Sequence, residues 1–186
     1  MKLAIAGLTA SGKTYQAKKL AERFGLDYIS GSEVLLRYAG VSPQDEVHYW
    51  LRSGRELTGR RVRDPTIDRR TDETILEIAR SRDNVIFDSW TLPWLYEGAD
   101  LFRIYLAARL ETRARIAYSS RTQKPFTVEE MMRLIQMKDE ESRGLFEKLY
   151  GIDIYDQSVF DNVVDNSDML PQQTTETLTG TLVIRV

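Results

Sequence analysis

Short apolar runs alternate along the chain with segments whose apolar residues recur every three or four positions. The runs typical of strands are Leu3–Ala6, Leu26–Ile29, Val85–Phe87, Leu101–Ala107 and Asn162–Val164. Strands that alternate with helices favour an α/β protein with a parallel sheet, because parallel neighbours need a crossover connection. We therefore predict a five-stranded parallel sheet with helices on both faces, which makes three α/β/α layers.

Several helix boundaries can also be predicted. After the first strand, Ala17, Leu20 and Phe24 share one helical face, and Gly25 follows them as a C-terminal cap. Further helices are predicted to begin near Ser30, Ser42-Pro43, Asp64-Pro65, the Thr127–Glu130 capping box and Pro171.

The first strand leads directly into Gly7-Leu8-Thr9-Ala10-Ser11-Gly12-Lys13-Thr14, which has the form G-x-x-x-x-G-K-[ST]. This spacing is typical of a loop that holds nucleoside triphosphate, because the glycines let backbone N–H groups turn inward around the phosphates. The Lys13 ammonium adds charge beside the β- and γ-phosphates, and the next helix points its positive end at the same anion. We predict that all eight residues bind ATP and that Lys13 is catalytic. The alternative is a glycine-rich turn without a ligand.

Composition narrows the class of protein. The 186 residues are predicted to form a single domain over 1–186, and the net charge of −2 argues against binding to a nucleic acid polymer. The chain has no cysteine, which excludes disulfides and thiolate catalysis. No apolar run approaches the ~20 residues of a membrane span, and no signal peptide is visible. A cytoplasmic enzyme that does not bind membranes is the simplest expectation.

Ligands of parallel sheets bind beyond the carboxyl ends of the strands, so the residues there are candidates for chemistry. The second strand is followed by Ser30-Gly31-Ser32-Glu33. We predict that Ser30, Gly31 and Glu33 contact a phosphoryl acceptor. The alternative is that Ser30 or Ser32 only caps a helix.

The third strand ends in Asp88. A carboxylate at this place beside a phosphate loop binds Mg²⁺ directly or through water, so Thr14 and Asp88 are the predicted metal ligands. An ordinary strand-end aspartate in a turn is the alternative.

Arginines form two groups. Within nineteen residues lie Arg52, Arg55, Arg60, Arg61, Arg63, Arg69 and Arg70. The second group comprises Arg113, Arg115 and Arg121. Guanidinium groups suit phosphates, so the first group is a candidate for acceptor binding. Arg115 and Arg121 are predicted to be catalytic in a lid over residues 113–127 that closes on the transferring phosphoryl group. For both groups the alternative is a solvated helix surface.

These stretches resemble the archaeal-type cytidylate kinases, a branch of the nucleoside monophosphate kinases. The resemblance covers nearly the whole chain. It rests on the phosphate loop, Tyr28–Glu33, Ile67-Asp68 with Asp72-Glu73, Leu110–Ala117, Tyr150–Ile154 and Phe160–Ser167. It implies transfer of the γ-phosphoryl group of ATP to CMP, dCMP or a related small-molecule acceptor, with Mg²⁺.

The sequence departs from this family at four arginine positions, which are occupied here by Leu36, Trp90, Lys138 and Leu145. The resemblance implies that those arginines serve the acceptor phosphate and the transferring phosphoryl group. We predict an acceptor-binding region over about residues 30–80, assisted by Trp90. Its predicted compensating arginines are Arg37, Arg60 and Arg63. Trp90, like Trp50 and Trp94, is alternatively a core residue.

Two other functions remain open at this point. The first is a kinase for a non-nucleotide alcohol, such as a metabolite or an antibiotic, which would need Glu33 or Asp88 as a general base. The second is a non-catalytic nucleotide-binding protein, although Lys13 and Thr14 argue against it.

Overall fold

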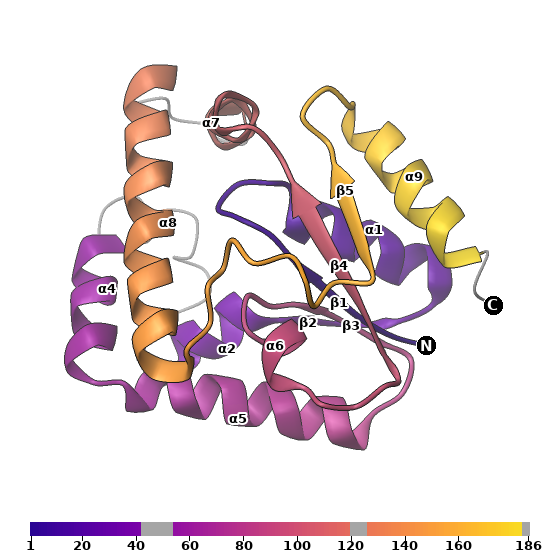
Figure 1. The fold of residues 1–186 in the computed structure, drawn as a ribbon, viewed down its shortest axis with the longest axis horizontal. Helices are drawn as coiled ribbons and strands as arrows, with labels where there is room; N and C mark the ends of the chain where they lie inside the picture. Colours follow the sequence, from indigo (N-terminus) through magenta and orange to yellow (C-terminus); the bar gives the residue numbers. More distant parts are fainter. Residues whose placement is uncertain (42–53, 120–125, 184–186) are drawn as a thin grey trace.

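The computed structural model describes residues 1–41, 54–119 and 126–183 (Figure 1). The helix predicted at Ser42-Pro43 therefore lies outside the described residues, as do Trp50, Arg52 and Arg121. The same holds for the side chain of Arg55.

Five strands form one sheet in the order β2-β3-β1-β4-β5, with parallel pairing throughout. The strands are β1 (Lys2–Ala6), β2 (Asp27–Ser30), β3 (Val85–Asp88), β4 (Leu101–Ala107) and β5 (Asn162–Asp165). The predicted five-stranded parallel sheet is confirmed, with strand boundaries that differ by at most one residue at either end.

Helices connect and cover these strands. They are α1 (Lys13–Phe24), α2 (Gly31–Tyr38), α4 (Gly54–Arg63), α5 (Thr66–Ser81), α6 (Leu92–Leu95), α7 (Leu110–Ser119), α8 (Val128–Tyr150) and α9 (Pro171–Val183). Two predicted boundary signals are present: the capping box of Thr127 and Glu130 opens α8, and Gly25 ends α1 with a left-handed φ of 64°. None of the helices among the described residues combines the length and apolarity that crossing a membrane requires.

The sheet has a core on each face because successive strand residues point to opposite sides. Leu3 and Ile5 of β1 are buried in the cluster that includes α1 and α9. Ala4, between them, belongs to the opposite cluster, which includes α2, α5 and α6. The fold therefore has the predicted three α/β/α layers.

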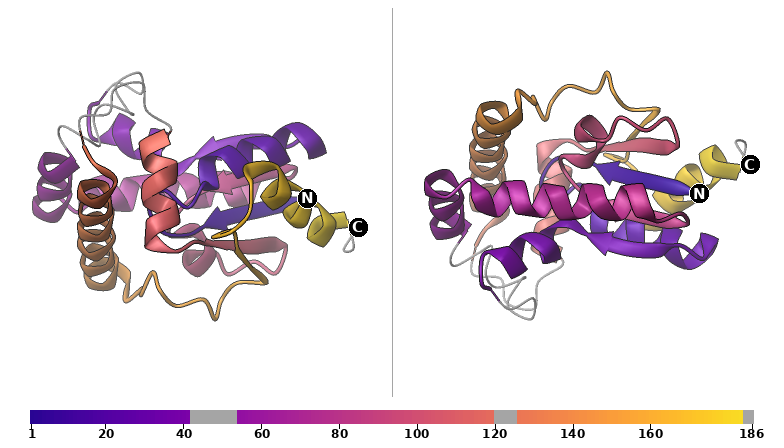
Figure 2. Two further views of the ribbon diagram at one scale, coloured as in Figure 1. Left: turned by 90° about the horizontal axis from the view of Figure 1, so that it is seen from above. Right: turned by 90° about the horizontal axis from the view of Figure 1, so that it is seen from below.

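Helices α4, α7 and α8 lie beyond the carboxyl ends of the strands (Figures 1 and 2). Helix α7 packs against α8 through Ala114, Met131 and Ile135. The far end of α8 carries Phe146, which packs near Trp90 just after β3. The space in which a parallel sheet binds its ligands is thus bordered by these helices.

Candidate active site

The phosphate loop has a backbone that requires its glycines. Gly7 has a φ of 146° and Gly12 a φ of 94°, conformations that residues with a side chain rarely adopt. A Cβ on Gly7 would lie 2.3 Å from the carbonyl oxygen of Leu106 in β4. Thr9 Oγ1 and Ser11 Oγ are buried, and neither has a hydrogen-bond partner among the described residues. A polyphosphate would satisfy such hydroxyls, so the loop fits the ligand that its sequence predicts.

Lys13 begins α1 and is only 8% exposed. Its Nζ donates to the carbonyl oxygen of Leu8 at 2.8 Å and lies 5.4 Å from the centre of the Trp90 ring. Burial lowers the pKa of Lys13, while the carboxylates of Asp88 and Asp139 partly offset that effect. The ammonium is therefore held inside the loop, where an anion can reach it.

Thr14 and Asp88, the predicted metal ligands, are brought together. Thr14 Oγ1 donates to Asp88 Oδ2 at 2.6 Å, and the Tyr28 hydroxyl also donates to that oxygen at 3.4 Å. A hydroxyl and a carboxylate beside a phosphate loop are the donor set that Mg²⁺ uses in phosphoryl transfer, since this ion is normally bound by few protein ligands and by substrate phosphates. The residues present fit the ion.

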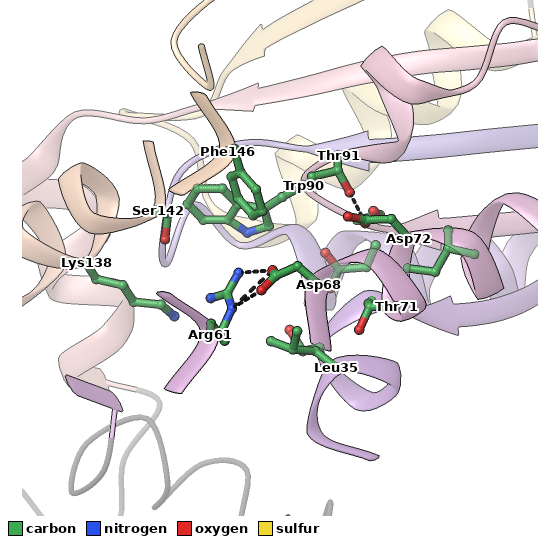
Figure 3. A pocket seen from close by; sticks show the side chains of 15 residues that line it. Leu35, Arg61, Asp68, Thr71, Asp72, Trp90, Thr91, Lys138, Ser142 and Phe146 are labelled. Carbon is green, nitrogen blue, oxygen red and sulfur yellow. Dashed lines mark hydrogen bonds and ion pairs between the residues drawn. The ribbon is translucent and has the colours of Figure 1, made fainter. Parts of the chain in front are cut away.

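A pocket adjoins this pair and receives side chains from α2, α4, α5, α8 and the segment after β3 (Figure 3). Asp88 and Trp90 line it on the side of the phosphate loop. Phe146 of α8 lies beside Trp90, with the two ring centres 6.0 Å apart. Lys138 also lines the pocket from α8. The arrangement suits an acceptor that meets the donor at Asp88.

A buried ion pair stands in the same pocket. Arg61 of α4 binds Asp68 of α5 with both Nε and Nη2, and the shortest distance, from Nη2 to Oδ1, is 2.6 Å. Arg61 is 5% exposed and Asp68 is 2% exposed. The guanidinium also lies 5.7 Å from the Phe146 ring. Asp68 thus fixes the Arg61 guanidinium at the pocket wall.

Asp72, one helical turn after Asp68, is a second buried carboxylate of the pocket. It accepts hydrogen bonds from Thr91 Oγ1 at 2.5 Å and from the Tyr150 hydroxyl at 2.7 Å. Burial raises the pKa of Asp72 to about 6, even though both hydrogen bonds act in the opposite direction. This carboxyl group therefore changes charge near neutral pH.

The predicted acceptor residues divide into two sets. Gly31 and Trp90 line the pocket. Ser30 accepts a hydrogen bond from the backbone N–H of Glu33 and so caps α2, while its contact with an acceptor stays a prediction. Glu33 itself is exposed and does not line the pocket.

The predicted compensating arginines lie outside the pocket lining. Arg37 and Arg63 are exposed, and Arg60 donates to the carbonyl oxygen of Ala39 at 2.8 Å. Arg61, which lies between the two predicted residues of α4, lines the pocket, and the acceptor roles of Arg37, Arg60 and Arg63 stay predictions. One signal could have identified it: Leu57 is fully buried, and Arg61 lies one turn later on the same helical face.

Among the predicted lid arginines, Arg115 is exposed on α7, while Arg121 lies outside the described residues. Their catalytic roles, and the lid over residues 113–127, stay predictions. Two of the positions without a family arginine, Leu36 and Leu145, are buried, whereas Lys138 lines the pocket. Trp94 packs edge-on against Phe160, which fits the core alternative for that residue.

Solved structures with the same fold include kinases. Shikimate kinase from Acinetobacter baumannii matches with a TM-score of 0.58 at 13% identity, covering 99% of this chain and 93% of that one. Deoxyadenosine kinase from M. mycoides matches with a TM-score of 0.58 at 16% identity, covering 98% and 99%. These likenesses show that the chain has the fold of these kinases, with a phosphate loop after the first strand.

Sequence comparison gives the family. The profile of the cytidylate kinase-like family matches residues 2–168. Cytidylate kinase of Ignicoccus hospitalis is 35% identical, with 94% of each chain covered. Cytidylate kinase of Desulfurococcus amylolyticus is 32% identical, with 89% of this chain and 83% of that one covered. The chain belongs to the cytidylate kinase-like family, as its motifs led us to expect.

Proposed function

We propose that this protein transfers the γ-phosphoryl group of ATP to CMP or dCMP, with Mg²⁺ as its cofactor. The observation that carries the proposal is the direct contact of Thr14 with Asp88, which joins a complete phosphate loop to an adjoining polar pocket. Membership of the cytidylate kinase-like family favours this acceptor over a non-nucleotide alcohol.

The donor side of the reaction uses the loop amides and Lys13. On binding of ATP, Lys13 exchanges its bond to the Leu8 carbonyl oxygen for the β- and γ-phosphates, which costs little because the ammonium is already in the loop. Thr14 and Asp88 hold Mg²⁺, which neutralises charge on the phosphates when it is bound.

The acceptor side has to compensate the charge of a phosphate dianion, because burying such a group without a cation is costly. Arg61 and Lys138 are cations that line the pocket, and we assign the acceptor phosphate to them. Asp68 orients Arg61 for this task. The buried carboxylates of Asp68 and Asp72 offer acceptors for the amino group of cytosine, and Trp90 with Phe146 offers aromatic surface to its ring.

The proposed reaction needs no general base. The attacking oxygen of a nucleoside monophosphate is already anionic, so positioning and charge neutralisation supply the acceleration. This distinguishes the proposal from an alcohol kinase, in which a carboxylate would have to remove the hydroxyl proton.

The test is ADP release from ATP·Mg²⁺ with CMP, dCMP, UMP, AMP and cytidine as separate acceptors. We expect release with CMP and dCMP, little with AMP, and none above background with cytidine. Release that depends on cytidine or on another uncharged alcohol, and not on any monophosphate, would overturn the proposal and establish the alcohol kinase instead.

A further inference from the structure

The apex of the phosphate loop is held from outside the strand and helix that the loop connects. The backbone N–H of Thr9 donates to Asp139 Oδ1 at 3.0 Å, and the carbonyl oxygen of Thr9 accepts from Arg113 Nη1 at 3.1 Å. Arg113 belongs to α7 and Asp139 to α8. The backbone N–H and carbonyl group of Thr9 are therefore both fixed by side chains of helices outside the loop.

The two side chains form a buried ion pair with each other. Arg113 Nη1 and Asp139 Oδ2 are 2.5 Å apart, and the side chains are only 7% and 1% exposed. Arg113 Nε also donates to the carbonyl oxygen of Ala108, just after β4, at 3.1 Å. Buried charges are tolerated when their hydrogen-bonding capacity is used, and here it is used on the backbone at Thr9 and Ala108.

The shape of the apex explains why an external hold is needed. Ala10, the next residue, has a φ of 62°, a left-handed conformation that is unfavourable for a residue with a side chain. Ala10 also packs against the cluster of Ala114, Met131 and Ile135, which joins α7 to α8. The loop apex is thus fixed by polar contacts at Thr9 and by apolar packing at Ala10.

We propose that Arg113 and Asp139 are positioning residues that keep the phosphate loop in its anion-binding shape, so that affinity for ATP depends on the packing of α7 against α8. The proposal rests on the proposed function, since it concerns the ATP site. The pair carries no net charge, and its effect on the phosphates therefore comes from backbone geometry.

Positioning and direct electrostatics predict opposite results for Asp139→Asn. This substitution removes a negative charge near the triphosphate, so a purely electrostatic role predicts tighter binding of ATP. A positioning role predicts weaker binding of ATP, because Arg113 is left as a buried, uncompensated charge and its hydrogen bond to Thr9 is lost. Arg113→Lys keeps the positive charge but removes the planar guanidinium. We therefore expect this variant to retain little of the parent's affinity for ATP.

The experiment is calorimetric titration of the full chain with ATP·Mg²⁺, together with the KM values for ATP and CMP. For Asp139→Asn we expect the dissociation constant and the KM for ATP to rise at least about tenfold, with the KM for CMP changed less than about twofold. The matched control is the half-exposed ion pair of Arg143 with Asp153. Arg143 lies on α8, as Asp139 does. Arg143→Lys and Asp153→Asn should leave ATP affinity unchanged.

A folded Asp139→Asn variant that binds ATP as well as the parent, or better, would overturn the proposal. If the variants do not fold, hydrogen exchange of the parent decides it: the Thr9 amide should be protected without nucleotide, and exchange at the rate of a solvated loop amide would contradict the inference. A parent chain that binds no ATP but protects the Thr9 amide would overturn the proposed function and not the hold on the loop.

Discussion

Thr14 and Asp88 are joined by a hydrogen bond of 2.6 Å, although 74 positions separate them in the chain. The contact follows from the topology. Thr14 follows β1, and Asp88 ends β3, which pairs with β1 in parallel so that Asp88 lies opposite Ile5. The carboxyl ends of neighbouring parallel strands meet at one edge of the sheet, and this edge therefore unites the two predicted metal ligands.

Removal of the divalent ion should stop phosphoryl transfer. We expect an excess of a Mg²⁺ chelator to abolish ADP release and added Mg²⁺ to restore it. Asp88→Asn should raise the Mg²⁺ concentration needed for half-maximal rate, because a neutral amide is a weaker ligand than a carboxylate. Asp83→Asn, an exposed change just before β3, is the control. An Asp88→Asn enzyme with the parent's Mg²⁺ dependence would remove Asp88 from the metal site.

Lys13→Ala should lower kcat by at least about 10²-fold, the scale expected when one donor to the transition state is lost. The variant should fold, since the ammonium donates to a loop carbonyl and its burial disfavours the charged form. Lys19→Ala, an exposed change on α1, provides the comparison. A folded Lys13→Ala enzyme with full turnover would refute the role of the phosphate loop.

The shape of the phosphate loop could be predicted from the sequence because the loop is contiguous. Eight adjacent residues define that shape, and strand and helix signals flank it. The sheet could be predicted equally well, since buried parallel strands are apolar runs separated by helical segments. Local sequence patterns could not show the hydrogen bonds of Arg113 and Asp139 to Thr9. Asp139 lies 26 positions after Arg113 and 130 positions after Thr9.

The acceptor pocket was harder to predict because it is assembled from five separate segments. Arg60, Arg61 and Arg63 differ in sequence position by only a few residues, yet each step turns the side chain about 100° around the helix. Packing of Leu57 decides which of them faces inward, and that packing depends on α2 and α5. Sequence spacing therefore could not show which arginine of this segment lines the pocket.

Arg61→Ala should raise the KM for CMP at least about tenfold and leave the KM for ATP nearly unchanged. The substitution removes a cation from the acceptor pocket and leaves the Asp68 carboxylate without its partner. Arg80→Ala, at the exposed end of α5, is the control. Initial rates at varied CMP and at varied ATP separate the two constants. If Arg63→Ala raises the KM for CMP and Arg61→Ala does not, the original sequence prediction is right and the assignment to Arg61 is wrong.

Asp72 should give the protein an unusual dependence of stability on pH. Its pKa is about 6 in the folded protein, against an ordinary value of 3.8. Between these values the folded state binds the proton and the unfolded state does not, so stability from this group is present below about pH 4 and is lost as the pH rises through about 6. Other carboxyl groups, whose pKa values are lowered, act in the opposite direction.

Comparison with Asp72→Asn isolates this effect, since asparagine cannot titrate. The free energy of unfolding of the parent, minus that of the variant, should fall as the pH rises from 4 to 6 and level off above 6. The limiting slope is about 1.4 kcal/mol per pH unit. Denaturant titrations at four or five pH values measure it, and a difference that is flat or rises over this range would contradict the raised pKa of Asp72.

Identification of the reaction products by phosphorus NMR tests most directly whether CMP is the phosphoryl acceptor. With ATP, Mg²⁺ and CMP, we expect equal amounts of ADP and CDP, no inorganic phosphate, and loss of both products on Lys13→Ala. Formation of ADP with inorganic phosphate and no CDP would contradict it. So would unchanged CMP in the presence of an alcohol that becomes phosphorylated.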